Sequence, residues 1–94
     1  MLSLAGELDL ADAPALREAL RRAVESSPKR LVVDLTEVTF VDSTILGALV
    51  EARSALGGDT FALAAPGLEV RRALEVSGLD RHFAVYETVS GALA

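Results

Sequence analysis

Short apolar segments alternate with longer amphipathic segments along this chain, and no other feature limits its fold as strongly. Strand-like segments fall at 2–8, 31–33, 39–41, 60–64 and 83–86. Helix-like segments fall at 12–26, 45–56 and 66–77, and a short helix is expected after residue 86. Each connection is long enough to hold a helix, so the central strands are expected to run parallel. The chain is therefore predicted to be an α/β domain with a mixed, mostly parallel sheet and packed helices.

Single residues predict where these elements begin, end or bend. Asp12 is expected to cap the first helix, and Gly57-Gly58 and Gly78 are expected to end the second and third helices. Gly6 is typical of a β-bulge or of a close backbone approach, and Asp34 is expected to end the buried strand before it. These positions give the predicted elements definite limits.

Length and composition restrict the possible functions. The 94 residues make one domain, 1–94, with a single core and no room for a separate substrate lobe. Although 51% of the residues are hydrophobic, no apolar run approaches the roughly 20 residues of a membrane helix, so no membrane insertion is expected. The net charge of −5, with nine basic residues scattered among fourteen acidic ones, argues against a nucleic-acid partner. The chain has no cysteine and no signal-peptide pattern, so a cytoplasmic location is the simplest inference.

No group of residues in the sequence predicts catalysis. The one histidine, His82, has no nucleophile near it in the sequence. Asp34, Glu37 and Asp42 could serve as metal ligands or as an acid–base pair, but carboxylates at strand ends are ordinary turn and cap residues. We therefore expect a protein that is not an enzyme and that uses neither a metal nor a cofactor.

The tripeptide Asp42-Ser43-Thr44 places two hydroxyls behind an apolar strand and directly before a predicted helix. A helix start presents unpaired N–H groups and a partial positive charge, so a phosphate is well received there as a ligand or as a modification. The alternative is that Ser43 merely caps the helix, since Ser and Asp are both preferred caps. These residues alone leave both interpretations open.

Several motifs resemble those of a known family in their order and spacing. They are Gly6-Glu7-Leu8-Asp9, Val33-Asp34-Leu35, the run from Val38 to Thr44, Leu46-Gly47 and Ser77-Gly78-Leu79. From about residue 2 to its end, the chain resembles a STAS domain of the anti-sigma factor antagonist family. The resemblance implies a STAS-like single-domain fold. Because family members usually carry another strand before the one at 2–8, the first family strand is expected to be missing here.

The resemblance also implies a function. In the family, the serine directly after the Asp is phosphorylated by a partner that is both a protein kinase and an anti-sigma factor, so this role falls on Ser43, with Thr44 as the fallback acceptor. The unmodified domain would bind the kinase and free a sigma factor, whereas a phosphate would add charge repulsion and a desolvation cost at the interface. A serine phosphatase would restore binding. The implied partner-binding residues are Glu7, Asp9, Asp42, Ser43, Thr44, Ile45 and Gly47.

Ile45 departs from the family pattern, which usually has glycine at this position. An exposed Ile45 would place a bulky side chain beside the phosphorylation site and could act as an apolar anchor in a partner pocket. A buried Ile45 would simply belong to the core.

Two other functions remain open. The first is a constitutive STAS-type structural subunit of a lipid-transport or stress-signalling complex; Ser43 would then only cap its helix, and Ser43→Ala would cost roughly 1 kcal/mol of stability. The second is a small enzyme or phospho-aspartate receiver with Asp34 or Asp42 as acceptor. Lys29 is the only lysine, so the lysine expected late in a receiver has no counterpart.

The first predicted strand, at 2–8, also bears on assembly. Without a further strand beside it, its outer edge would expose unpaired backbone groups, which invite pairing with another strand. We therefore expect a weak tendency to form a homodimer.

Overall fold

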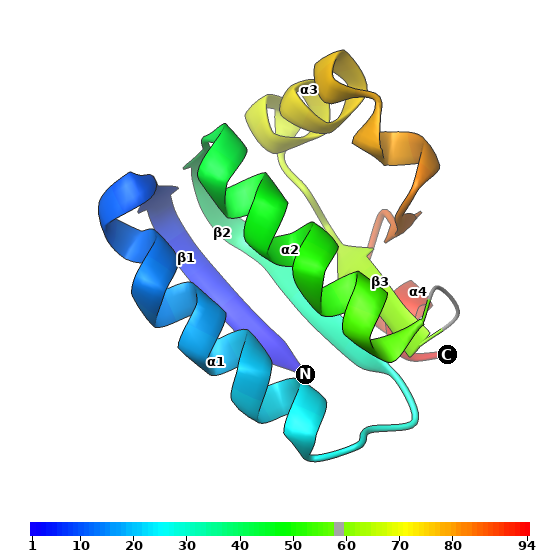
Figure 1. The fold of residues 1–94 in the computed structure, drawn as a ribbon. Coiled ribbons are helices and arrows are strands. Elements are labelled where there is room, and N and C mark those ends of the chain that lie inside the picture. Colours follow the sequence, from blue (N-terminus) through cyan, green and yellow to red (C-terminus); the bar gives the residue numbers. More distant parts are fainter. Residues whose placement is uncertain (58–59) are drawn as a thin grey trace.

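In the part of the chain that the structure describes, four parallel strands form the sheet. A computed structural model describes residues 1–57 and 60–94. The strands are β1 (Leu2–Leu8), β2 (Leu31–Val41), β3 (Phe61–Ala64) and β4 (Ala84–Tyr86), and they lie side by side in the order β1-β2-β3-β4 (Figure 1). Each neighbouring pair in the described residues is parallel, which confirms the predicted α/β fold with a mostly parallel sheet.

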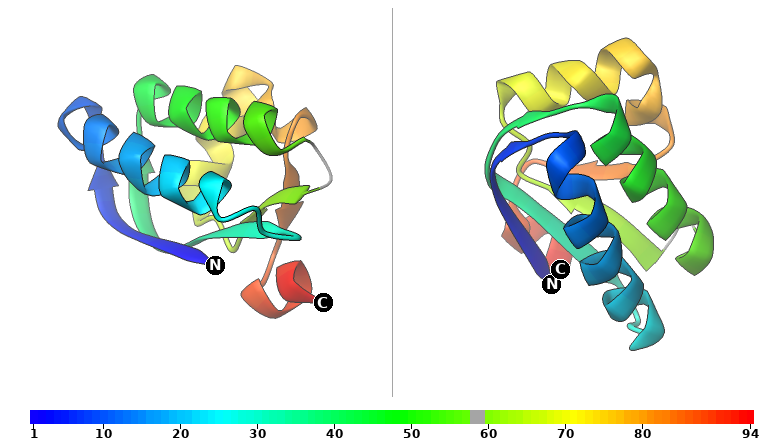
Figure 2. Two further views of the ribbon diagram at one scale, coloured as in Figure 1. Left: turned by 60° about the horizontal axis from the view of Figure 1, so that its bottom comes forward. Right: turned by 60° about the vertical axis from the view of Figure 1, so that its left-hand side comes forward.

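Helices connect the strands and cover both faces of the sheet. They are α1 (Ala13–Glu25), α2 (Ser43–Leu56), α3 (Leu68–Ser77) and α4 (Val89–Leu93), with 3₁₀ turns η1 (Leu10–Asp12) and η3 (Leu79–Arg81). Figure 2 shows α1, α2 and α3 on one face and α4 on the other. Within the described ranges, no helix is long and apolar enough to cross a bilayer.

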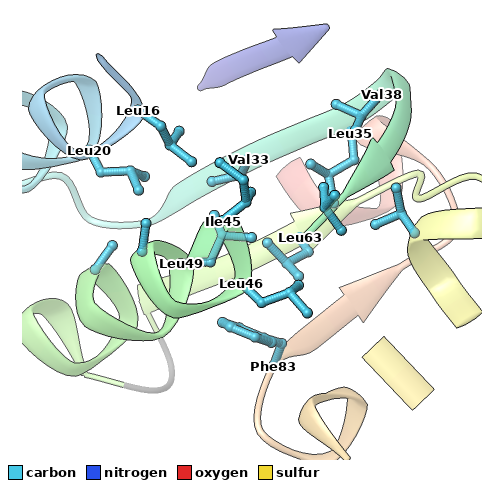
Figure 3. Close-up of a cluster of buried hydrophobic side chains, with 14 of the residues drawn as sticks. Leu16, Leu20, Val33, Leu35, Val38, Ile45, Leu46, Leu49, Leu63 and Phe83 are labelled. Atoms are coloured by element: carbon cyan, nitrogen blue, oxygen red, sulfur yellow. The ribbon is translucent and has the colours of Figure 1, made fainter. Parts of the chain in front are cut away.

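The main hydrophobic core lies between the sheet and helices α1 to α3. Its most deeply buried side chains, each at most 1% exposed, include Val33, Leu35, Ile45, Leu49 and Leu63 (Figure 3). A smaller cluster, packed beneath α4, consists of Val32, Ala62, Ala64 and Ala92. Successive residues of β2 thus point into two different clusters, which explains why its start is a continuous apolar run.

β2 is longer than predicted, because Asp34 does not end it. The Asp34 carboxylate turns back on its own strand, where Oδ1 accepts hydrogen bonds from the Thr36 amide at 3.0 Å and from the Thr36 hydroxyl at 2.6 Å. Just after Asp34 the register against β1 slips by one residue, between Ser3 and Ala5 of β1. The prediction of a strand end at Asp34 was wrong, since the residue belongs to a bulge inside one continuous strand.

A second slip in the same strand pair confirms the bulge predicted at Gly6. Between Gly6 and Glu7 of β1, the partner strand carries one extra residue, Thr39. Gly6 has a φ of +85°, a backbone conformation that glycine adopts at little cost. A Cβ at this position would meet no atom within 4 Å, so conformation, rather than a close backbone approach, requires the glycine.

Glycines end α2 and α3 as predicted. The Gly57 amide donates to the Arg53 carbonyl at 2.8 Å, whereas Gly58 lies outside the described residues. Gly78 follows α3 in the left-handed conformation, with a φ of +77°. The start of α1 differs from the prediction, because Asp12 precedes the helix without making a side-chain capping bond to it.

Candidate functional site

The carboxyl ends of the parallel strands meet the starts of the following helices at one edge of the sheet, which we call the carboxyl edge. It comprises residues 7–12, 40–46, 64–70 and 86–89. The starts of α1, α2 and α3 lie along this edge, in the upper part of Figure 1. The Asp42 amide donates to the Leu8 carbonyl at 3.3 Å, which ties the end of β1 to the start of α2. Two predicted site segments far apart in sequence are thereby brought together.

Asp42 caps helix α2. Its backbone is extended, with φ −101° and ψ 179°, and its Oδ1 accepts a hydrogen bond from the Ile45 amide at 3.1 Å. The Asp42 carbonyl accepts the first helical bond, from the Leu46 amide at 3.1 Å. The cap predicted as the alternative role of Ser43 therefore belongs to Asp42, because only the residue with extended backbone can reach the free amides of the first turn.

Ser43 is the first residue of α2, and its side chain is exposed. Among the described residues its hydroxyl makes no hydrogen bond, so the oxygen is free to react or to contact a partner. Thr44, the fallback acceptor, is half-buried. Both residues lie in the first turn, where the helix dipole favours added negative charge.

Ile45 belongs to the core. Its side chain is 0% exposed and lies among Val33, Leu46 and Leu49 (Figure 3). Of the two alternatives left open for Ile45, burial favours the core residue over the exposed apolar anchor. Gly47, half-buried and farther along α2, would have no atom within 4 Å of an added Cβ, so packing does not require glycine there.

Asp9 and Glu7 are both exposed at the end of β1. Asp9 has a structural role, since its Oδ1 accepts a hydrogen bond from the Ala11 amide at 3.0 Å. In return, the Asp9 amide donates to Oδ2 of Asp12 at 3.0 Å, and the two carboxylates together shape turn η1. Asp9 thus performs the turn and cap role, while its exposure leaves it available for contact.

Three exposed apolar side chains at the carboxyl edge were missed by the sequence reasoning. Leu10 is 68% exposed, Phe40 is 47% exposed and Leu68 is 71% exposed. Signals in the sequence could have revealed two of them, Phe40 and Leu68. The bulge at Gly6 reverses the alternation of β2, so Phe40 points outward. Leu68 lies off the buried side of α3 that Val70 and Leu74 define.

The predicted metal and catalytic alternatives gain no support from the geometry. In the described ranges, no three His, Asp or Glu side chains gather where they could hold a metal ion. Asp34 is occupied by its bonds to Thr36. His82 is exposed just before β4, at the opposite end of the sheet from Ser43.

Comparison with known families tests the family resemblance that the motifs indicated. The family model described as "STAS domain" matches residues 1–92, nearly the whole chain. The chain belongs to the STAS domain family. The fold and the order of motifs in this STAS domain agree with that assignment, so the resemblance drawn from its sequence is confirmed.

Relatives of this STAS domain are named as anti-sigma factor antagonists. The anti-sigma-F factor antagonist RsfB of Mycobacterium tuberculosis is 37% identical over 94 residues, which cover 99% of this chain and 77% of that protein. The anti-sigma-B factor antagonist of Listeria monocytogenes is 40% identical over 79 residues, covering 82% of this chain and 69% of the relative. The crystal structure of an anti-sigma factor antagonist from Mycobacterium paratuberculosis matches with a TM-score of 0.89 at 40% identity, over 97% of this chain and 79% of that one. These proteins are named for a protein that they counteract and not for a reaction.

Proposed function

We propose that this protein is an anti-sigma factor antagonist that acts by phosphorylation-dependent partner switching. In the unmodified state it binds an anti-sigma factor that is also a serine kinase. Phosphorylation of Ser43 ends that binding, and a serine phosphatase restores it. The observation that carries the proposal is the exposed, unbonded hydroxyl of Ser43 at the start of α2, beside an Asp42 that already supplies the cap.

A phosphate on Ser43 would act on the surface and leave the fold intact. It adds roughly two negative charges at the helix end whose dipole favours them. No described hydrogen bond of the folded chain is lost when the hydroxyl is modified. A partner that covers Ser43, however, would have to desolvate a dianion, which costs several kcal/mol when the charge is left unpaired. The modification therefore changes binding without first changing the structure.

The acceptor is Ser43 and not Thr44, because Thr44 is half-buried whereas Ser43 is exposed. Mass spectrometry of the protein isolated from its source organism tests this assignment directly. We expect phosphate on Ser43 in the wild type and an unmodified Thr44 in the Ser43→Ala variant. Phosphate found on Thr44 in the wild type would contradict the assignment.

Partner capture from a lysate of the source organism tests the switch. The bait proteins are the wild type, Ser43→Ala, Ser43→Asp and Ser90→Asp. Ser90 is a matched control, because it is an exposed serine in the first turn of α4, away from α2. We expect a kinase-type anti-sigma factor, identified by mass spectrometry, on every bait except Ser43→Asp. Equal capture on all four baits would favour the constitutive subunit and would overturn the proposed switch.

A further inference from the structure

Carboxylates gather at the carboxyl edge, and basic side chains avoid it. The acidic residues of this edge are Glu7, Asp9, Asp12, Asp42, Glu69 and Glu87. The segments 7–16, 37–50, 64–70 and 84–94 contain no Lys or Arg. Helix dipoles explain acidic residues in first turns, such as Glu69 of α3. They explain neither Glu7, which lies on a strand, nor the complete lack of cations.

The apolar trio, which we define as Leu10, Phe40 and Leu68, lies at the same edge and comes from three different elements. Leu10 lies two residues after Leu8, whose carbonyl binds the Asp42 amide, and so lies beside the start of α2. Phe40 is the second-last residue of β2, three residues before α2 begins at Ser43. Leu68 follows Gly67, whose Cβ position would lie 3.8 Å from the carbonyl oxygen of Val38 on β2.

Leu10 and Leu68 expose most of their side chains and so add little to folding, whereas Phe40 buries about half of its side chain. An isolated exposed leucine is ordinary. Apolar side chains that are 68%, 47% and 71% exposed and share one edge with a free serine are typical of an interaction surface. The surrounding charge indicates what kind of partner fits, because opposite potentials face each other across protein interfaces.

We propose that the carboxyl edge is a two-part docking surface for a partner that presents apolar pockets surrounded by arginine and lysine. The apolar trio fills the pockets, and the carboxylates of the edge meet the basic groups. This inference rests on the proposed function, since it takes the partner to be the anti-sigma factor. The trio governs how slowly the complex dissociates, and the carboxylates govern how fast it forms.

With such a partner, charge repulsion is not the main reason why phosphorylation ends binding. Basic groups on the partner attract a phosphate and do not repel it. Release must then come from burying the dianion of phosphorylated Ser43 among the apolar trio, where it loses its hydration without gaining a matched cation. Repulsion, the cause that the family resemblance suggests first, becomes secondary on this surface.

A titration with model peptides tests the surface without the natural partner. The ¹⁵N-labelled protein is titrated with an amphipathic helical peptide of leucine and lysine, and separately with its leucine–glutamate counterpart. We expect the cationic peptide to shift the amide signals of residues 8–12, 39–46 and 66–70, and the acidic peptide to leave them unchanged. Shifts centred elsewhere, or equal shifts with both peptides, would overturn the inference.

Variants of the trio test whether each of its side chains contributes to peptide binding. Leu10→Ser, Phe40→Thr and Leu68→Ser should each weaken cationic-peptide binding by about tenfold, the effect of losing one anchor. Val76→Ser is the matched control, since Val76 is 83% exposed but lies near the far end of α3. Thermal unfolding checks that the variants stay folded; Leu10→Ser and Leu68→Ser should cost little stability, and Phe40→Thr should cost more. Equal weakening by the control would contradict a localised surface.

Measurements of binding to the anti-sigma factor distinguish a failure of this inference from a failure of the proposed function. Affinity for the factor should fall in the trio variants but not in Val76→Ser, and the association rate of the wild type should fall as salt is raised. If the factor binds the wild type and every trio variant equally, the docking surface is wrong while the proposed function stands. If the factor fails to bind the wild type, the proposed function is wrong, and the peptide titration still decides the surface.

Discussion

At the start of α2, two adjacent residues have different tasks. The Asp42 carboxylate accepts the Ile45 amide and so stabilises the helix. Ser43, one residue later, already has a helical backbone, and its hydroxyl is left without a bond in the described part of the chain. A switch needs this separation, because a hydroxyl that capped the helix could not be modified without weakening the fold.

Unfolding in urea tests the separation of tasks. Asp42→Ala removes the cap and should lower the free energy of unfolding by about 1 kcal/mol, whereas Asp42→Asn should largely retain it. Ser43→Ala removes no described bond and should change stability by less than about 0.5 kcal/mol. A Ser43→Ala cost equal to that of Asp42→Ala would show that the serine also caps the helix.

Gly6 and Gly47 form a matched pair for a second test. Gly6→Ala should destabilise the protein by about 1 to 2 kcal/mol, because alanine is strained at a φ of +85°. Gly47 lies inside α2 with open space at its Cβ position, so Gly47→Ala should stabilise the protein by about 0.5 to 1 kcal/mol. Urea unfolding measures the change in the free energy of unfolding for each variant. Changes of the same sign would contradict this interpretation of the backbone.

The order of strands and helices could be predicted from sequence because hydrophobic periodicity depends on which side of each element is buried. The limits of β1 were predicted as observed. The continuity of β2 could not be predicted, because Asp34 usually breaks strands. Here the Thr36 hydroxyl donates to the Asp34 carboxylate within a bulge, so the residue stays in the strand. Local preference does not reveal that neighbouring strands hold such a residue in the sheet.

The candidate site was predictable in part for similar reasons. The position of Asp42 and Ser43 between a strand and a helix was readable from the sequence. Which of the two caps the helix depends on a one-residue difference in where helical backbone begins, and such limits are uncertain from sequence. The exposure of Phe40 depends on the bulge, and the burial of Ile45 depends on the packing of α2 against the sheet.

The bulge at Asp34 predicts a pH effect on stability. Hydrogen bonds from the Thr36 hydroxyl and then the Thr36 amide hold the pKa of Asp34 below its ordinary value of 3.8, against a smaller opposing effect of burial. Because the pKa is lower in the folded state, the carboxylate stabilises the fold fully above its unfolded pKa and loses this effect as pH falls through the folded pKa.

Urea unfolding between about pH 5 and about pH 2.5 measures this effect. The stability of the wild type should fall more steeply on acidification than that of Asp34→Asn, because all other carboxylates are common to both proteins. Thr36→Val, which removes the hydroxyl donor, should give an intermediate slope. Parallel pH profiles for all three proteins would show that Asp34 carries no such linkage.

At the scale of the whole molecule, the outer edge of β1 is a surface suited to self-association. Among the described residues, β1 pairs only with β2, so backbone groups along Leu2–Leu8 are available on its other side. Light scattering of this 94-residue chain should show its mass rising with concentration, and Ala5→Lys on the exposed strand should suppress the rise. Ser54→Lys on α2 is the control. A monomer mass at every concentration would exclude this association.

Leu10 and Leu68 of the apolar trio are largely solvent-exposed and Phe40 is half-exposed, whereas the core that holds the fold together is elsewhere. Substitutions at Leu10 or Leu68 would therefore alter the proposed recognition at little cost in stability. After gene duplication, such a scaffold could acquire a new partner without first becoming unstable. Several copies in one cell could then drift apart in binding preference and signal in parallel without crosstalk, all sharing the switch proposed at Ser43.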